Sequence, residues 1–419
     1  MTPADDYSAV RGSLREKIME RIDFSRKVPD SEVLDMIDEY ITGAKAAGVS
    51  VLTLEEKKRL RQELFHSIRR LDILQDLLDD PGITEIMVNG PNSIFIEKAG
   101  ELRPYSAVFS SPEKFEDVIQ QIVGASNRVV NTASPIVDCR LANGDRVNVV
   151  LQPVAVNGPI LTIRRFPEKP ITIGDLLSYQ SINEEIAGFM KRCVRAGLNI
   201  FVSGGTGSGK TTFLNVMADF IDPRERVITI EDNAELQIRN VPNLVRLEAR
   251  NANVEGCRPI SIRDLIKSSL RMRPDRIIVG EVRGAEAIDM IQAMNTGHDG
   301  SMSTGHANSA ADILSRLETM ILMGMELPLT AIRGQLASGI DLIVHLCRFR
   351  DRSRKVQEIA EVTGMENGQI TLSTLYRFRE TGEKNGKIIG DWQKENELTH
   401  TFKFEMAGIP VGTGNSVLS

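Results

Sequence analysis

The residues best suited to chemistry form one glycine-rich run near the middle of the chain. Residues 204–211 read GGTGSGKT, which fits the pattern G-x-x-x-x-G-K-[ST]. The apolar segment NIFVS precedes this run and an apolar helical pattern follows it. Glycines let a backbone wrap closely around an anion, and the first turn of the following helix presents unpaired amides to it. The run therefore predicts a phosphate-binding loop; a plain glycine-rich turn is the alternative.

Within this loop, Lys210 and Thr211 are expected to have different roles. We expect Lys210 to neutralise the β- and γ-phosphate oxygens of a nucleotide and Thr211 to ligate Mg²⁺. One such lysine–phosphate pair at about 4 Å contributes roughly 4 kcal/mol at an effective dielectric near 20, before desolvation. The predicted nucleotide-binding residues are Gly204, Gly205, Thr206, Gly207, Ser208, Gly209, Lys210, Thr211 and Thr212.

Two other apolar segments end in acidic residues. The segment RIIVGE ends at Glu281, and VITIED ends at Glu231 and Asp232. Because ligands lie at the C-terminal edge of a parallel sheet, we expect these carboxylates to face the phosphate loop. There, Glu231 and Glu281 could hold Mg²⁺ or activate a water, with Glu281 slightly favoured as the base. A solvated acid at a strand end is the alternative for each.

A further polar segment, GHDGSMSTGHAN at residues 297–308, contains His298 and His306. Its glycines argue against a helix, and no cysteine or third histidine stands near it in the sequence to complete a zinc site. We expect SMSTGH to form a strand that brings His306 to the γ-phosphate or its water. A purely structural role is the alternative for both histidines, and it weighs more for His298.

The elements that must position these groups fall into successive segments. A capping box is predicted at Thr53 and Glu56, strands alternate with helices beyond residue 177, and two prolines mark a linker before it. The expected segments are a helical N-terminal region at 1–80, an α+β domain at 81–165, a linker at 166–176, a RecA-like α/β domain at 177–345 and a small strand-rich appendage at 346–419.

Composition limits the class of protein. The chain has 419 residues, a net charge of −6 and 41% hydrophobic residues, which is typical of a globular protein of two to four domains. No apolar run approaches the roughly 18 residues of a membrane span, and no secretory signal is evident, so we expect a cytoplasmic protein. The mild acidity and few aromatic residues argue against a nucleic-acid partner.

Basic residues are nevertheless concentrated locally. Between Arg239 and Arg283 they outnumber acidic residues, which we interpret as a solvated or intersubunit face. In the range Arg348–Arg354 every second residue is arginine. On a single strand, that spacing would place all of these arginines on one exposed face.

The motifs GGTGSGKTT, ITIEDNAEL, RPDRIIVGEVRGAEAIDMIQAMNTGHDGSMSTGHAN and SRLETMILM together resemble those of the secretion-ATPase superfamily, which powers type II secretion, type IV pili and type IV secretion. Within it, the chain resembles the CpaF/TadA branch, the assembly motor of tight-adherence pili. The resemblance covers most of residues 80–365. It implies an α/β fold with a RecA-like P-loop core, a smaller α+β N-terminal domain and a helical N-terminal arm.

The same resemblance implies site residues. Glu231 and Asp232 match the family's Asp box, and Glu281 matches its Walker B glutamate. His298 and His306 match its His box.

The resemblance also implies that arginines of the N-terminal domain reach the phosphates. The matching positions here are Arg146, together with Arg164 or Arg165.

Finally, the resemblance implies an activity and partners. It implies a cytoplasmic homohexamer that hydrolyses ATP with Mg²⁺ and docks peripherally on polytopic inner-membrane platform proteins of a pilus or secretion system. The alternatives are a nucleic-acid translocase built on the same core and a nucleotide-gated scaffold without turnover.

Overall fold

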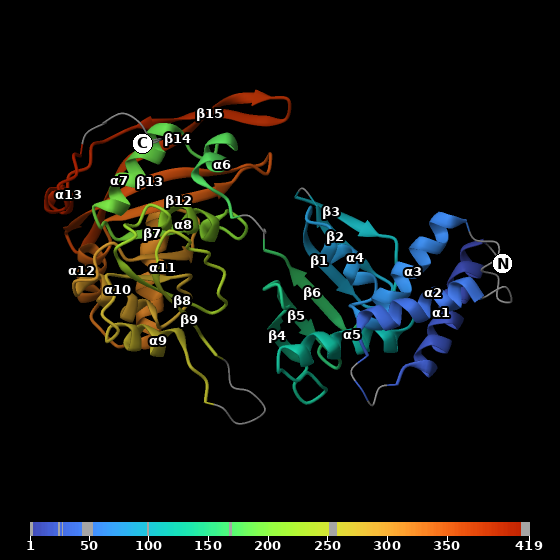
Figure 1. Ribbon diagram of the computed structural model, residues 1–419. Coiled ribbons are helices and arrows are strands. Elements are labelled where there is room, and N and C mark those ends of the chain that lie inside the picture. Colours follow the sequence, from blue (N-terminus) through green and yellow to red (C-terminus); the bar gives the residue numbers. More distant parts are fainter. Residues whose placement is uncertain are drawn as a thin grey trace. The chain divides into compact units, whose positions relative to one another are not determined.

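The computed structural model describes residues 3–23, 26, 28–43, 53–98, 100–166, 170–250 and 258–411. The chain divides into two compact units, Met1–Glu168 and Lys169–Ser419 (Figure 1). The division falls within the predicted linker at 166–176. Each unit has its own hydrophobic core and is described by itself.

The N-terminal unit begins with three helices that share a core. They are α1 (Pro3–Arg21), α2 (Asp30–Gly43) and α3 (Leu54–Arg69). Buried leucine, isoleucine and valine side chains from all three helices pack together. The predicted capping box starts α3, because the Thr53 hydroxyl accepts from the Glu56 amide at 3.2 Å and the Glu56 carboxylate accepts from the Thr53 amide at 2.7 Å.

A six-stranded antiparallel sheet forms the rest of this unit, in the order β3-β2-β1-β6-β5-β4. Its elements are α4 (Ile73–Asp79), β1 (Ile83–Asn89), β2 (Ile94–Lys98), β3 (Glu101–Tyr105), α5 (Pro112–Ala125), β4 (Ile136–Arg140), β5 (Arg146–Val150) and β6 (Ile160–Arg164). Apolar side chains alternate along the strands and pack beneath α4 and α5. Leu74 and Leu77 of α4 belong to this core, so the predicted boundary at residue 80 separates a helix from the sheet that it covers.

The C-terminal unit is built on a nine-stranded sheet in the order β15-β14-β13-β12-β7-β11-β10-β8-β9. Its parallel strands are β7 (Ile200–Gly204), β8 (Arg226–Glu231), β9 (Asn243–Glu248), β10 (Arg276–Val279), β11 (Met302–His306) and β12 (Leu342–Arg348). The helices are α6 (Ile173–Ser178), α7 (Glu184–Arg195), α8 (Lys210–Ala218), α9 (Ile262–Ser269), α10 (Ala287–Asn295), α11 (Ala310–Gly324), α12 (Leu329–Gly339) and α13 (Phe402–Ala407).

Helices cover both faces of this sheet. On β7, Ile200 and Val202 pack into one core with α7 and α8, whereas Phe201 packs into the other core with α9 to α12. Strands buried on both faces read as continuous apolar runs, and that pattern made the parallel α/β prediction possible. The predicted fold class is confirmed.

The C-terminal segment is part of the same sheet. Strands β13 (Arg354–Glu366), β14 (Gln369–Lys384) and β15 (Lys387–Lys394) continue it antiparallel from β12 (Figure 1). The segment is strand-rich as predicted, but it extends the sheet rather than forming a separate appendage. Val356 and Trp392 pack into the cluster that contains α7 and α8, whereas Ala360 and Val362 pack into the core on the other face.

The alternating arginines do not lie on one strand, so the condition for a single exposed face is not met. Strand β12 ends at Arg348 and β13 begins at Arg354, and the residues between them form a turn closed by the Phe349 amide donating to the Ser353 oxygen at 2.8 Å. Arg352 adopts a positive φ of 66° in this turn. Across the described ranges, no helix combines the length and apolar character needed to span a membrane.

Candidate functional site

The predicted phosphate loop joins the central strand to a helix. Strand β7 ends at Gly204, and α8 begins at Lys210. Strand β7 is paired on both sides, with Gly204 beside His306 of β11 and beside Leu346 of β12. A Cβ atom at Gly204 would collide with the Leu346 carbonyl oxygen, and Gly209 has a φ of 94°, so the loop needs glycine at both positions.

Lys210 is folded back onto the loop. Its Nζ donates to the carbonyl oxygens of Gly204 at 3.0 Å and Gly205 at 2.9 Å, and lies 3.3 Å from His306 Nδ1. The side chain is buried. The backbone oxygens thus hold the ammonium group beside the predicted phosphate loop.

His306 connects this lysine to an acidic residue. Its Nε2 lies 2.9 Å from Glu281 Oε1, and the other oxygen of Glu281 accepts from Arg283 at 2.6 Å. Burial and the nearby Lys210 lower the pKa of His306, although Glu281 opposes them. A neutral imidazole with its lone pair on Nδ1 accepts from Lys210, whereas Glu281 Oε1, although close to Nε2, has no hydrogen-bond partner among the described residues. The structure therefore brings together three residues that the sequence analysis singled out.

Glu231 ends β8 on the same edge of the sheet and is buried. Its Oε1 accepts from the amides of Glu235 at 2.8 Å and Leu236 at 2.9 Å, so the carboxylate shapes its own loop. Burial raises the pKa of Glu231 to about 7, despite the opposing effect of those amides. A Cβ atom on Gly280 would lie 2.9 Å from Glu231 Cγ, so the glycine after β10 makes room for this side chain.

The loop and the strand ends fit a magnesium–nucleotide complex. Within the described part of the chain, Ser208 Oγ and Glu231 Oε2 are buried without a hydrogen-bond partner. The described residues contain no cluster of three or more His, Cys, Asp and Glu side chains that could hold a metal ion by themselves. Because Mg²⁺ usually takes one or two protein ligands and completes its shell with phosphate and water, Thr211 and the carboxylates Glu231 and Glu281 remain suitable.

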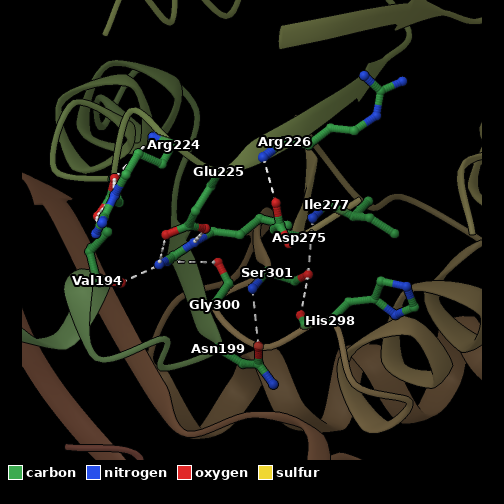
Figure 2. Close-up of polar contacts among 12 residues, drawn as sticks. Val194, Asn199, Arg224, Glu225, Arg226, Asp275, Ile277, His298, Gly300 and Ser301 are labelled. Atoms are coloured by element: carbon green, nitrogen blue, oxygen red, sulfur yellow. Dashed lines mark hydrogen bonds and ion pairs between the residues drawn. The ribbon is translucent and has the colours of Figure 1, made fainter. Parts of the chain in front are cut away.

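His298 is not brought to this loop. Strand β11 runs from Met302, beside Ile200, to His306, beside Gly204. His298 precedes that strand and therefore lies toward the opposite edge of the sheet, on the order of 13 Å away at 3.3 Å per residue. Figure 2 shows His298 near Ser301, whose hydroxyl donates to the His298 carbonyl at 2.7 Å. The arrangement within this chain favours the structural alternative for His298.

Two arginines near the site, Arg283 and Arg354, were not identified by the sequence analysis. Arg283 binds Glu281 and lies 4.0 Å from Asp232, which joins two acidic residues from neighbouring strand ends. Arg354 donates from Nε to the Gly207 oxygen at 2.8 Å. Its alternation with other arginines was visible in the sequence, but the turn that folds it onto the loop was not.

The N-terminal unit carries the arginines named by the resemblance. Arg146 on β5 pairs directly with Arg164 on β6 and with Arg140 on β4, so three arginines lie side by side on one face. Arg165 is buried instead, and its guanidinium donates to the Asp80 oxygen and to the Ile83 oxygen at 3.2 Å. Of the two alternatives at this position, Arg164 is therefore the exposed one.

Comparison with known proteins places the chain in a family. Residues 69–386 match the family model described as type II/IV secretion system protein. The chain is 33% identical to conjugal transfer protein TrbB of Rhizobium radiobacter, covering 78% of this chain and 98% of that protein. It is 32% identical to the type IV secretion system protein VirB11 of Brucella suis, covering 69% and 86%.

The chain is also similar to solved structures. The crystal structure of the Brucella suis VirB11 ATPase in complex with sulphate is 28% identical, covers 69% of this chain and 92% of that one, and has a TM-score of 0.38. The Yersinia pseudotuberculosis ATPase DotB is 16% identical, covers 80% of each chain and has a TM-score of 0.50. The chain belongs to the type II/IV secretion system protein family and is an ATP hydrolase of that family.

Proposed function

We propose that this ATPase hydrolyses Mg·ATP at the loop Gly204–Thr211 and that it works as a homohexameric motor of a pilus or secretion system. The observation that carries the site assignment is the contact chain from Lys210 through His306 to Glu281, which begins on the phosphate loop. It joins an anion-binding cation to an acid that can orient water, as hydrolysis of a phosphoanhydride requires.

Nucleotide binding changes the contacts among Lys210, His306 and Glu281 in a simple way. Phosphate oxygens replace the carbonyl oxygens of Gly204 and Gly205 as acceptors for Lys210, because a charged acceptor binds an ammonium group more strongly than a neutral one. Lys210 then makes a weaker contact with His306. When the negative charge of the phosphates favours protonation of the imidazole, its Nδ1 donates to a γ-phosphate oxygen. Thr211 and either Glu281 or Glu231 would hold Mg²⁺, which would supply charge neutralisation at the phosphate oxygens.

Glu281 is the stronger candidate for the residue that positions the attacking water. It lies next to His306 and Arg283, so each of its carboxylate oxygens faces a nitrogen group. Glu231 is occupied by two backbone amides, although a pKa of about 7 would also suit a base. We assign Glu281 to the water and Glu231 to the shape of the loop and to the metal side of the site.

Two glutamine variants separate these roles. Glu281→Gln is expected to bind ATP with nearly unchanged affinity but to lower single-turnover hydrolysis by about 100-fold or more, the usual contribution of a base. Glu231→Gln is expected to retain more of the turnover and to shift its dependence on Mg²⁺ concentration. The opposite order of the two effects would assign the base to Glu231.

The place of this motor in a cell is proposed from the family. The relatives are named for conjugal transfer and type IV secretion, and the sequence motifs resemble the CpaF/TadA branch. We infer that the chain forms a hexamer in the cytoplasm and binds polytopic inner-membrane platform proteins. Size-exclusion chromatography with light scattering tests the hexamer. Capture of membrane partners beside an assay of DNA-stimulated hydrolysis tests the partner, and stimulation by DNA without platform capture would favour a nucleic-acid translocase.

A further inference from the structure

The turn between β12 and β13 lies against the phosphate loop. Arg354, the first residue of β13, donates from Nε to the carbonyl oxygen of Gly207 at 2.8 Å. A Cβ atom on Gly209 would lie 3.5 Å from Arg354 Cδ, and one on Gly207 would lie 3.7 Å from a guanidinium nitrogen of Arg348. Two arginines from a segment more than a hundred residues away thus border the loop that binds phosphate.

The sheet register places the turn there. Strand β12 runs parallel to β7 with Leu346 beside Gly204, so β12 passes the end of β7 and turns next to the loop. The turn is held internally, because Asp351 Oδ1 accepts from the Ser353 amide at 2.9 Å. Its other oxygen accepts from the Ile388 amide of β15 at 2.9 Å, which ties the turn to the outer strands. These bonds fix the position from which Arg354 reaches the loop.

The hydrogen bond from Arg354 to the Gly207 oxygen affects the direction in which the Ser208 N–H points. In a planar trans peptide, the carbonyl of one residue and the N–H of the next point in opposite directions. The guanidinium that holds the Gly207 oxygen therefore directs the Ser208 N–H away from Arg354, toward the Gly205 oxygen, to which it donates at 3.3 Å. A phosphate oxygen is a stronger acceptor and can replace this carbonyl when nucleotide binds. The neighbouring glycines have φ values of 70° at Gly207 and 94° at Gly209, and glycine backbones rotate readily unless something holds them.

We propose that Arg354 is a positioning residue of the phosphate loop, which keeps the Gly207–Ser208 peptide in the orientation that presents its N–H to a nucleotide phosphate. The proposal rests on the proposed function in one respect, namely that this loop binds a nucleotide. Loop amides of this type cradle the α- and β-phosphates. Loss of Arg354 therefore weakens ADP and ATP to the same extent.

The test compares three variants of the full-length protein by calorimetric titration with ADP and with a nonhydrolysable ATP analogue. Arg354→Met keeps the length of the side chain but removes its donors, and Arg354→Lys keeps one flexible donor. Arg350→Met is the matched control, because Arg350 belongs to the same turn but pairs with Glu380 at 2.7 Å and Glu383 at 3.1 Å.

Arg354→Met is expected to weaken both nucleotides by about tenfold, the size of one charge-assisted hydrogen bond, and Arg354→Lys by about threefold. Turnover at saturating ATP is expected to stay within about twofold of the wild type, since the groups that act on the γ-phosphate are untouched. Arg350→Met is expected to match the wild type.

Three results would overturn the proposal. They are unchanged affinity in Arg354→Met, a loss confined to the ATP analogue, and a fall in saturated turnover without a fall in affinity. Failure of the nucleotide assignment itself would look different, because then the wild type would not bind ADP, or Lys210→Ala would bind it equally well.

Discussion

At the level of single side chains, the site depends on the polar neighbours of three groups. Lys210 is held by two carbonyl oxygens and His306, and His306 is held between Lys210 and Glu281. Every one of these contacts can be exchanged for a phosphate oxygen or a water without moving the backbone. A chain of exchangeable contacts on a rigid strand end suits a site that must bind and release nucleotide repeatedly.

Replacing Lys210 tests the site most directly. We expect Lys210→Ala to abolish turnover with the fold intact, because its contacts in the free protein are to backbone oxygens of its own loop. Phosphate release measures the first effect and circular dichroism the second. Hydrolysis at the wild-type rate in this variant would contradict the assignment of residues 204–211 as the nucleotide-binding loop.

The two histidines should differ sharply. Because His306 contacts Lys210 and Glu281 whereas His298 lies toward the far edge of the sheet, we expect His306→Asn to lower kcat by about tenfold or more. His298→Asn should change it by less than about threefold, within what a surface substitution does through stability alone. Steady-state kinetics of both variants under one set of conditions measure the difference. Equal losses of kcat would show that His298 contacts a reacting group through an arrangement that a single copy of the chain does not form.

Glu231 should make the stability of the free protein depend on pH. Its pKa rises from 4.5 to about 7 on folding, so the folded state binds the proton more tightly. The resulting stabilisation is complete below the unfolded pKa and is lost as pH rises toward 7, a difference of up to about 3 kcal/mol. Glu231→Gln keeps an oxygen for the Leu236 amide but carries no charge.

We therefore expect Glu231→Gln to be more stable than the wild type at pH 8, by about 1–3 kcal/mol, and to show little or no such gain at pH 5. Urea denaturation without nucleotide or divalent cation at both pH values measures this difference. The same gain at both pH values would show that the charge of Glu231 is not its cause.

At the level of elements, the sequence predicts what is local. The phosphate loop, the capping box at Thr53 and the strand ends at Glu281 and His306 were predicted, because each depends on residue types within a few positions of one another. The place of His298 was not predicted from its spacing, because the strand between the two histidines sends them toward opposite edges. Arg354 was missed because the residues between Arg348 and Arg354 form a turn, in which Arg352 has a positive φ, and the spacing of the arginines does not reveal where that turn places Arg354.

A buried arginine stabilises the end of the parallel strands that lies opposite the phosphate loop. Arg276 starts β10, pairs with Glu225 at 2.5 Å and donates to the Val194 oxygen at 2.6 Å. Figure 2 shows Glu225, Val194 and Gly300 gathered at this point. A Cβ atom on Gly300 would collide with the guanidinium of Arg276, and Gly300 also has a φ of 78°.

Two alanine variants separate these two constraints. Gly297→Ala meets only the backbone strain, because Gly297 has a φ of 87° and open space around its Cβ position among the described residues. We expect it to cost about 1 kcal/mol, and Gly300→Ala to cost about 3 kcal/mol or more, since it also displaces a buried ion pair. Thermal or chemical unfolding measures both costs. Equal costs would mean that Arg276 moves aside without loss.

At the level of the whole molecule, the phosphate loop and the row of arginines belong to different units. Arg140, Arg146 and Arg164 occupy paired positions on three adjacent strands. Like charges directly opposite on neighbouring strands destabilise a sheet. Arg146 lies 3.9 Å from Asp138, but a partly exposed ion pair contributes little, so binding of an anion explains the row better than stability does.

This reasoning leads to a prediction about catalysis rather than stability. We expect Arg164→Ala and Arg146→Ala each to lower kcat by about tenfold or more, as expected when a cation that stabilises transferring phosphoryl oxygens is lost. Unfolding free energies should stay within about 0.5 kcal/mol of the wild type, because each substitution relieves repulsion within the row and Arg146→Ala removes only one partly exposed ion pair, with Asp138. Arg103→Ala is the matched control, since Arg103 lies on β3 of the same sheet and pairs with exposed Glu101 at 2.7 Å.

Wild-type turnover in both row variants would confine catalysis to the C-terminal unit. A loss of turnover that follows a loss of stability would make the row structural. A fall in kcat with unchanged stability, absent in the control, would assign the row to the phosphates.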